Sequence, residues 1–136
     1  MSINFSAIAI WLLKLLAAII MLQTLYFKFT AAEESVYIFT KLGMEPYGRI
    51  GIGALELVAS ILILYPKTTV YGAMLAIGLM TGALFFHITK LGIEVQGDGG
   101  QLFIYALLVL LAATALFFIY RNQLLDVLRI SYKYRI

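Results

Sequence analysis

The chain alternates between long apolar stretches and shorter polar connections. Four stretches contain mostly apolar residues over a length near that of a membrane span, and they are Phe5–Phe29, Tyr47–Tyr65, Thr69–Ile88 and Gln101–Tyr120. A helix needs ~20 residues to cross the hydrocarbon core of a bilayer. Lipid offers no hydrogen bonds to the backbone, and the alternation typical of a membrane β-strand is absent. Each stretch is therefore predicted to be a transmembrane helix.

The two longer connections carry patterns of their own. Between residues 30 and 46, Val36, Phe39 and Leu42 recur at a spacing of three. This spacing predicts a short amphipathic helix in the membrane interface, with a solvated loop as the alternative. The segment Thr89–Gly100 is acidic and glycine-rich, and it is predicted to be a loop in which Asp98 caps the following helix rather than binding a cation.

Four crossings place the N-terminus, the turn at Lys67 and the tail 121–136 on one side of the membrane. The tail mixes leucines with basic residues, which is typical of an amphipathic helix on an anionic leaflet. That side carries Lys67, Arg121, Arg129, Lys133 and Arg135, and the opposite side carries Lys28, Lys41, Arg49 and Lys90. Because basic residues concentrate in cytoplasmic segments, both termini are predicted to be cytoplasmic.

Composition agrees with this picture and removes several classes of function. Of 136 residues, 63% are hydrophobic and 12% charged, and the mean hydropathy is +0.99. The fold class is therefore an all-α, integral membrane four-helix bundle. No cysteine is present, which excludes disulfides, thiol redox chemistry and thiolate metal sites. A net charge of +3 gives no indication of nucleic acid binding. The first apolar stretch is too long for a signal peptide and is expected to be retained.

Glu56 is the residue that most requires an explanation, because it lies inside the second apolar stretch. A charge at the centre of a membrane costs about 2.5–3.5 kcal/mol even on insertion scales, so such residues usually face a partner or mark a functional site. Counted along their helices, Glu56 and Lys14 both lie about 14 Å from a helix end. We therefore predict that Lys14 and Glu56 pair near the midplane. Without that pair, Glu56 is expected to be neutral.

A second group of polar residues is predicted at the outer ends of the first three helices. Lys28 ends the first, Arg49 begins the second and His87 ends the third. With the acidic residues of the two outer loops, they would form a polar vestibule above Glu56, suited to the oxygenated head of a quinone or a lipid. These acidic residues are Glu33, Glu34, Glu45, Glu94 and Asp98. The alternative is that Lys28 and Arg49 anchor helix ends in the interface and His87 is an interfacial residue. A lone histidine cannot make a haem or metal site, so no metal is expected.

Small residues in the third stretch suggest how the helices pack. Gly72 and Ala76 form one pair four residues apart, and Gly78 and Gly82 form another. In a membrane such pairs let helices approach closely. Two pairs predict two packing partners and favour a homo-oligomer over a monomer.

Several short motifs, taken together, resemble those of the DoxX family over nearly the whole chain. They are Gln23-Thr24-Leu25 with Lys28, Lys41-Leu42-Gly43-Met44-Glu45-Pro46, Arg49-Ile50-Gly51, Glu56-Leu57, Pro66-Lys67-Thr68, Gly72-Ala73, Gly82-Ala83 with His87, and Gly97-Asp98-Gly99-Gly100. The resemblance implies one transmembrane domain over residues 1–136 in the bacterial inner membrane. It also implies that Lys28, Arg49, Glu56 and His87 are the positions of the family's polar features.

The same resemblance suggests what the protein works with. Relatives include membrane subunits of thiosulfate:quinone oxidoreductase and proteins that assemble with membrane-associated redox and detoxifying enzymes. This chain lacks the cysteines of the thiol-handling relatives and the glycine-rich C-terminal end of some members. The motifs of a complete enzyme are also missing.

Three functions are therefore considered. The first is a membrane subunit of a redox complex that engages a quinone or lipid head group, with quinone as a non-covalent cofactor and membrane lipid and a redox enzyme as partners. The second is a non-catalytic membrane scaffold. The third is a small transporter. It is less favoured, because four helices in one protomer leave little room for a gated path unless the protein oligomerises.

Overall fold

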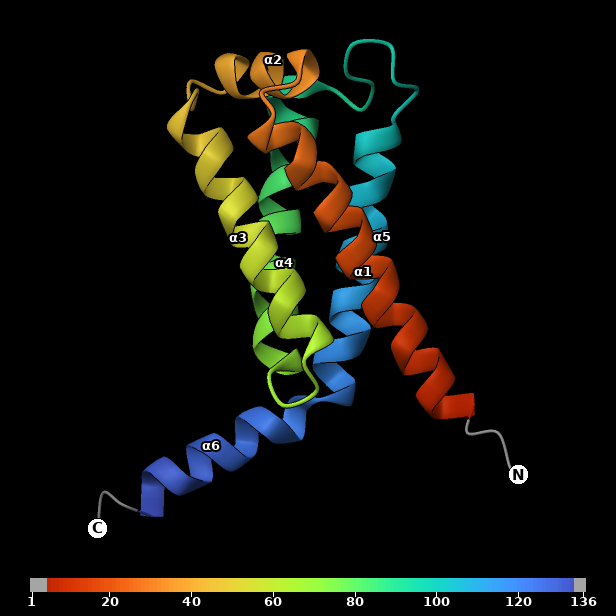
Figure 1. Cartoon of the computed structure of the whole chain (residues 1–136), viewed down its shortest axis with the longest axis vertical. Coiled ribbons are helices and arrows are strands. Elements are labelled where there is room, and N and C mark those ends of the chain that lie inside the picture. Colours follow the sequence, from red (N-terminus) through yellow and green to blue (C-terminus); the bar gives the residue numbers. More distant parts are fainter. Residues whose placement is uncertain (1–4, 134–136) are drawn as a thin grey trace.

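The computed structural model describes residues 5–133 and is helical throughout its long elements. Four helices are long and apolar enough to cross a membrane. They are α1 (Phe5–Phe29), α3 (Tyr47–Leu64), α4 (Thr69–Phe86) and α5 (Gln101–Ile119). Figure 1 shows these four helices side by side in one bundle, with the shorter elements at its two ends. The predicted all-α membrane bundle is confirmed.

The shorter helices define the two ends of the bundle. Helix α2 (Glu33–Lys41) lies across one end, which we call the α2 end, together with the loop that follows η1 (His87–Leu91), a turn of π-helix continuing α4. Helix α6 (Arg121–Lys133) lies at the other end, the α6 end, where the α3–α4 turn and the start of α1 also lie (Figure 1). The predicted grouping of connections at the two ends is therefore confirmed, as is the helix within residues 30–46.

Helix α6 leaves the bundle at a steep angle and is attached near its start (Figure 1). The Gln123 side chain donates to the carbonyl of Pro66 at 2.5 Å and accepts from the backbone N–H of Val70 at 3.1 Å. The predicted helical tail is confirmed as far as Lys133, whereas Arg135 lies outside the described residues. A helix held at one end and extended away from the bundle suits the plane of a membrane surface.

The bundle has small residues inside and bulky apolar residues outside. Eight alanines are buried among the described residues, beside a few larger side chains such as Met21, Ile63 and Leu116, whereas many large side chains, for example Leu12 and Leu111, are more than half exposed. This is the reverse of a water-soluble bundle, in which large apolar residues fill the core. Because lipid solvates the outer side chains, close packing of small residues holds membrane helices together.

Two glycines set the contacts of α3 with its neighbours. A Cβ on Gly72 would lie 2.6 Å from the backbone nitrogen of Ile63, so α4 meets α3 as closely as helices can. A Cβ on Gly53 would lie 2.8 Å from the Phe29 ring. The end of α1 therefore packs directly against α3 at Gly53. The predicted packing role of Gly72 is thus confirmed.

Gly78 and Gly82 behave differently from Gly72. A Cβ added to either would meet nothing within 4 Å. Within the described chain α4 contacts two helices, α3 and α5, but this second pair of small residues makes neither contact through a close backbone approach. These glycines border open space instead, because they lie at the edge of the cavity described below.

Candidate functional site

An ion pair between α1 and α3 forms the centre of the candidate site. The ammonium nitrogen Nζ of Lys28 lies 3.2 Å from Oε1 and 3.1 Å from Oε2 of Glu56. Both side chains are largely buried, with 14% and 5% of their surfaces exposed. The contact of Phe29 with Gly53 explains the pairing, because it brings the last turn of α1 level with the middle of α3.

Thr24 completes this group from one turn earlier on α1. Its hydroxyl lies 3.0 Å from the carbonyl of Met21 and 3.5 Å from Oε2 of Glu56. A threonine hydroxyl has one proton to donate, so it serves one of these acceptors at a time. The shorter bond goes to Met21, which leaves Glu56 with an acceptor oxygen that a ligand can approach.

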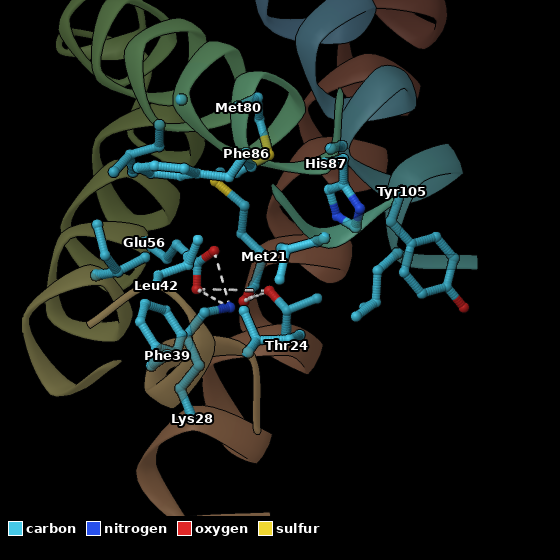
Figure 2. A pocket seen from close by; sticks show the side chains of 18 of the residues that line it. Met21, Thr24, Lys28, Phe39, Leu42, Glu56, Met80, Phe86, His87 and Tyr105 are labelled. Atoms are coloured by element: carbon cyan, nitrogen blue, oxygen red, sulfur yellow. Dashed lines mark hydrogen bonds and ion pairs between the residues drawn. The ribbon is translucent and has the colours of Figure 1, made fainter. Parts of the chain in front are cut away.

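The ion pair borders a cavity of about 230 Å³ inside the bundle. Side chains from α1, α2, α3, α4, η1 and α5 line it, and most of them are apolar, including Phe39, Met80 and Phe86. Figure 2 shows Glu56, Lys28 and Thr24 directed toward one another, with the apolar side chains around them. The cavity therefore combines apolar walls with one concentrated polar point.

His87 lines the same cavity at a distance from the ion pair. In Figure 2 its ring lies near Tyr105, well away from Glu56. Nδ1 is 2.9 Å from the carbonyl oxygen of Gly92, and the ring packs edge-on against Phe103 with centroids 5.8 Å apart. These contacts tie the end of α4 to the following loop, so His87 supports the wall of the cavity.

Arg49 is buried but does not line the cavity, contrary to the prediction of a basic vestibule. Its Nε lies 2.9 Å from Oε1 of Glu45, and its Nη1 donates to the backbone carbonyl of Lys28. A guanidinium group readily satisfies the carbonyls at the end of a helix. Arg49 therefore fixes the end of α1, and this holds the Lys28 backbone where its side chain reaches Glu56.

The acidic loop residues also lie outside the cavity. Oδ1 of Asp98 accepts hydrogen bonds from the backbone N–H of Val95 at 3.0 Å and of Gly100 at 2.8 Å. Its Oδ2 accepts from the N–H of Leu102 at 3.3 Å, in the first turn of α5. Asp98 thus satisfies an N–H group in the first turn of α5, as predicted, although Gly100 occupies the N-cap position itself. The Glu94 carboxylate accepts a hydrogen bond from the N–H of Gly99 at 3.4 Å. Both acidic residues therefore stabilise the loop and do not form a polar vestibule above Glu56.

Lys14 does not pair with Glu56, and that prediction is wrong. Lys14 is 1% exposed, and its ammonium lies 4.5 Å from the centre of the Trp11 ring and 4.7 Å from that of Tyr120. Tyr120 ends α5 at the α6 end, so Lys14 is near that end of the bundle. The estimate of its depth failed because α1 has 25 residues against 18 in α3, and its first turns extend past the other helices.

A second cavity of about 350 Å³ lies on the other side of Lys28, beneath the start of α2. Thr24, Lys28 and Tyr105 line both cavities, and Glu34 lines the second. Oε1 of Glu34 is buried without a hydrogen-bond partner among the described residues. Burial raises the pKa of Glu34, and the negative charge of Asp98 raises it further.

Sequence reasoning missed most of the residues that line the cavity, and Thr24, Phe86 and Tyr105 are three examples. Thr24 was noted only as part of a motif, although its spacing of four from Lys28 places both on one face of α1. Phe86 and Tyr105 carry no signal of their own, because aromatic residues in apolar helices usually pack in a core. Their position beside Glu56 or His87 depends on how the helices meet.

Four lipid-crossing helices around a buried ion pair and a cavity define a small multi-pass membrane protein with an internal, mostly apolar cavity. The chain belongs to the DoxX-like family, whose profile matches residues 12–117. The match covers every residue of the ion pair and both cavities. Neither the curated proteins nor the solved structures contain a significant match to this chain.

Proposed function

We propose that the cavity binds the head group of an isoprenoid quinone, and that the protein serves as a membrane subunit of a redox complex. The observation that carries this proposal is the Lys28–Glu56 pair in the wall of an otherwise apolar cavity. Small-molecule sites are typically apolar with a few placed polar groups that set orientation. A lipid head group with a carbonyl oxygen would use the same contacts.

The pair offers complementary partners to both oxidation states of a quinone. The ammonium of Lys28 can donate to a quinone carbonyl, and the carboxylate of Glu56 can accept from a quinol hydroxyl. Reduction of a quinone to a quinol takes up two electrons and two protons. In this proposal Glu56 takes one proton from a bound quinol as it is oxidised and returns it to a quinone as it is reduced, while the second proton and the two electrons pass to or from the partner enzyme. The chain has no cysteine, so the electrons would come from a partner enzyme.

Binding of decylubiquinone to the purified protein in lipid nanodiscs tests this proposal. We expect Glu56→Gln to weaken binding by about 10- to 100-fold, because a hydrogen bond to a charged group contributes about 1.5–3 kcal/mol. Glu33→Gln, an exposed position at the start of α2, is the matched control and should bind as the wild type does.

A double variant guards against a trivial loss of folding. Lys28→Met with Glu56→Gln leaves neither partner of this pair charged, so it should fold and still fail to bind. Wild-type affinity in this variant would contradict the proposal. Unchanged binding in Glu56→Gln together with loss of a co-purifying partner would instead support the scaffold function.

A further inference from the structure

A shallow groove on the outer surface of α3 shares two lining residues with the internal cavity. It has a volume of about 470 Å³ and an almost wholly apolar lining, which includes Met44, Gly48, Gly51, Ile52, Leu55 and Val58. Met44 and Ile52 also line the internal cavity beside Glu56. The cavity and the groove therefore meet at these two side chains.

The opposite side of the junction is formed by α4. Gly78 and Gly82 line the internal cavity, yet Gly78 is exposed and Gly82 is only partly buried. A Cβ at either position would meet nothing within 4 Å. A cavity wall that is also outer surface marks an opening, and here the opening lies on the lipid-facing side of a membrane span.

The packing of α3 and α4 explains why the opening occurs at this level. At the α6 end, Gly72 brings α4 against the backbone of Ile63 and Ala59. From that contact the two helices draw apart toward the α2 end, as Figure 1 shows. Glycine at positions 78 and 82 then leaves the widening gap free of side chains.

We propose that the cavity opens to the bilayer through a portal made by Met44, Ile52, Gly78 and Gly82, and that the ligand is an amphiphile whose apolar tail lies in the α3 groove. The proposal rests on the proposed function for the head group and adds the class of ligand and its path. A cavity of about 230 Å³ is below the ~300–1,000 Å³ typical of ligand pockets. It suits a head group whose tail lies elsewhere.

The lining of the groove favours a hydrocarbon tail over other occupants. Its walls are glycine and aliphatic side chains, with no charged residue. The thioether of Met44 is flexible enough to adjust at the junction. A tail that starts beside Glu56 and leaves through the portal would enter the groove directly, because Ile52 and Met44 belong to both.

Bulky side chains at the portal test the proposal. In lipid nanodiscs, we would compare the binding of decylubiquinone with that of the same ring carrying no tail. We expect Gly78→Leu and Gly82→Leu to weaken decylubiquinone binding by at least about tenfold. Gly51→Leu adds a side chain to the groove alone, so it should weaken decylubiquinone binding by a similar factor and change binding of the tailless ring by less than about threefold. Thr81→Leu, at an exposed α4 position that lines neither space, is the matched control and should bind both as the wild type does.

The outcomes separate this inference from the proposed function. If the wild type binds neither ring, the proposed function fails. If it binds both rings equally well and Gly78→Leu changes nothing, the head-group site stands and the portal is overturned. A loss of dimer mass in Gly51→Leu by light scattering, with decylubiquinone binding intact, would also overturn the proposal, because the groove would then be an interface between two copies of the chain.

A photoreactive group at the end of the decyl tail gives an independent measurement. We expect the cross-link in the peptide that contains Leu55 and Val58. Labelling confined to α5 would overturn the assigned path of the tail.

Discussion

The two lysines on the buried face of α1 show two different ways to hold a positive charge inside a membrane bundle. Lys14 and Lys28 are fourteen residues apart on one helix, so they project from the same side. Lys14 sits between the Trp11 and Tyr120 rings at the α6 end. Lys28 is paired with the Glu56 carboxylate in the other half of the bundle.

The two arrangements differ in the hydrogen-bonding groups that they can offer to a ligand. Aromatic rings attract a cation through their quadrupoles but offer no strong hydrogen-bond acceptor. The site of Lys14 therefore holds α1 against the end of α5. It does not offer a ligand a donor and an acceptor together. The pair of Lys28 and Glu56 holds no net charge, yet it presents both a donor and an acceptor to a cavity. This makes the second lysine, and not the first, a candidate for binding.

The largest effect is expected from breaking the ion pair. Lys28→Met leaves the Glu56 carboxylate buried without its cation, and we expect a loss of about 3 kcal/mol in the free energy of unfolding. Titration with SDS in mixed micelles, followed by circular dichroism, measures this loss. Glu56→Gln added to Lys28→Met should recover most of it, because no charge is then left unpaired. Additive losses in the double variant would show that the two residues do not act as a pair.

Much of the fold was predictable from the chain alone, because lipid restricts the backbone to few solutions. The four apolar stretches, the helices between residues 30 and 46 and in the tail, and the bond from the first turn of α5 to Asp98 depend on local spacing, and the structure confirms them. The faces of α1 were also predictable, since Lys14 and Lys28 follow a helical repeat.

The side chain that pairs with Glu56 was not predictable in the same way. Rise per residue locates a group along its own helix but does not say how far one helix slides past the next. Here that offset is set by Phe29 against Gly53, a contact that pairs Glu56 with Lys28 and leaves Lys14 far away. The role of Gly78 was missed for a related reason, because glycines that border a cavity have the same spacing as glycines that pack helices.

The second effect concerns Lys14 and is expected to be smaller. Lys14→Met keeps an apolar stem of similar length and removes the cation from between two rings, so we expect a loss of about 1–2 kcal/mol. The same SDS titration measures it. Tyr120→Phe keeps the ring and should leave stability nearly unchanged. A loss for Lys14→Met as large as that for Lys28→Met would contradict the distinction between the two lysines.

The smallest effects extend the comparison to two carboxylates at the α2 end, one well bonded and one not. Burial raises the pKa of Asp98, but the N–H groups of Val95, Gly100 and Leu102 outweigh this and lower its pKa overall. Its contribution to stability is therefore present above its ordinary pKa of 3.8 and is lost as the pH falls through the lower value of the folded state.

The pKa of Glu34 is shifted in the opposite direction to that of Asp98, so its effect on stability at neutral pH is also opposite. Because its pKa is raised by burial and by Asp98, the folded state favours the protonated form, and ionisation at neutral pH lowers stability. Glu34→Gln should therefore raise the melting temperature at pH 7, by a few degrees at most, with the gain vanishing below about pH 4.5, the ordinary value. Asp98→Asn should lower the melting temperature at pH 7 and have less effect as the solution becomes acidic. Melting curves of the wild type and both variants over this range measure how each change in melting temperature depends on pH. The two dependences should have opposite signs. The same sign for both would contradict the difference between a hydrogen-bonded and a merely buried carboxylate.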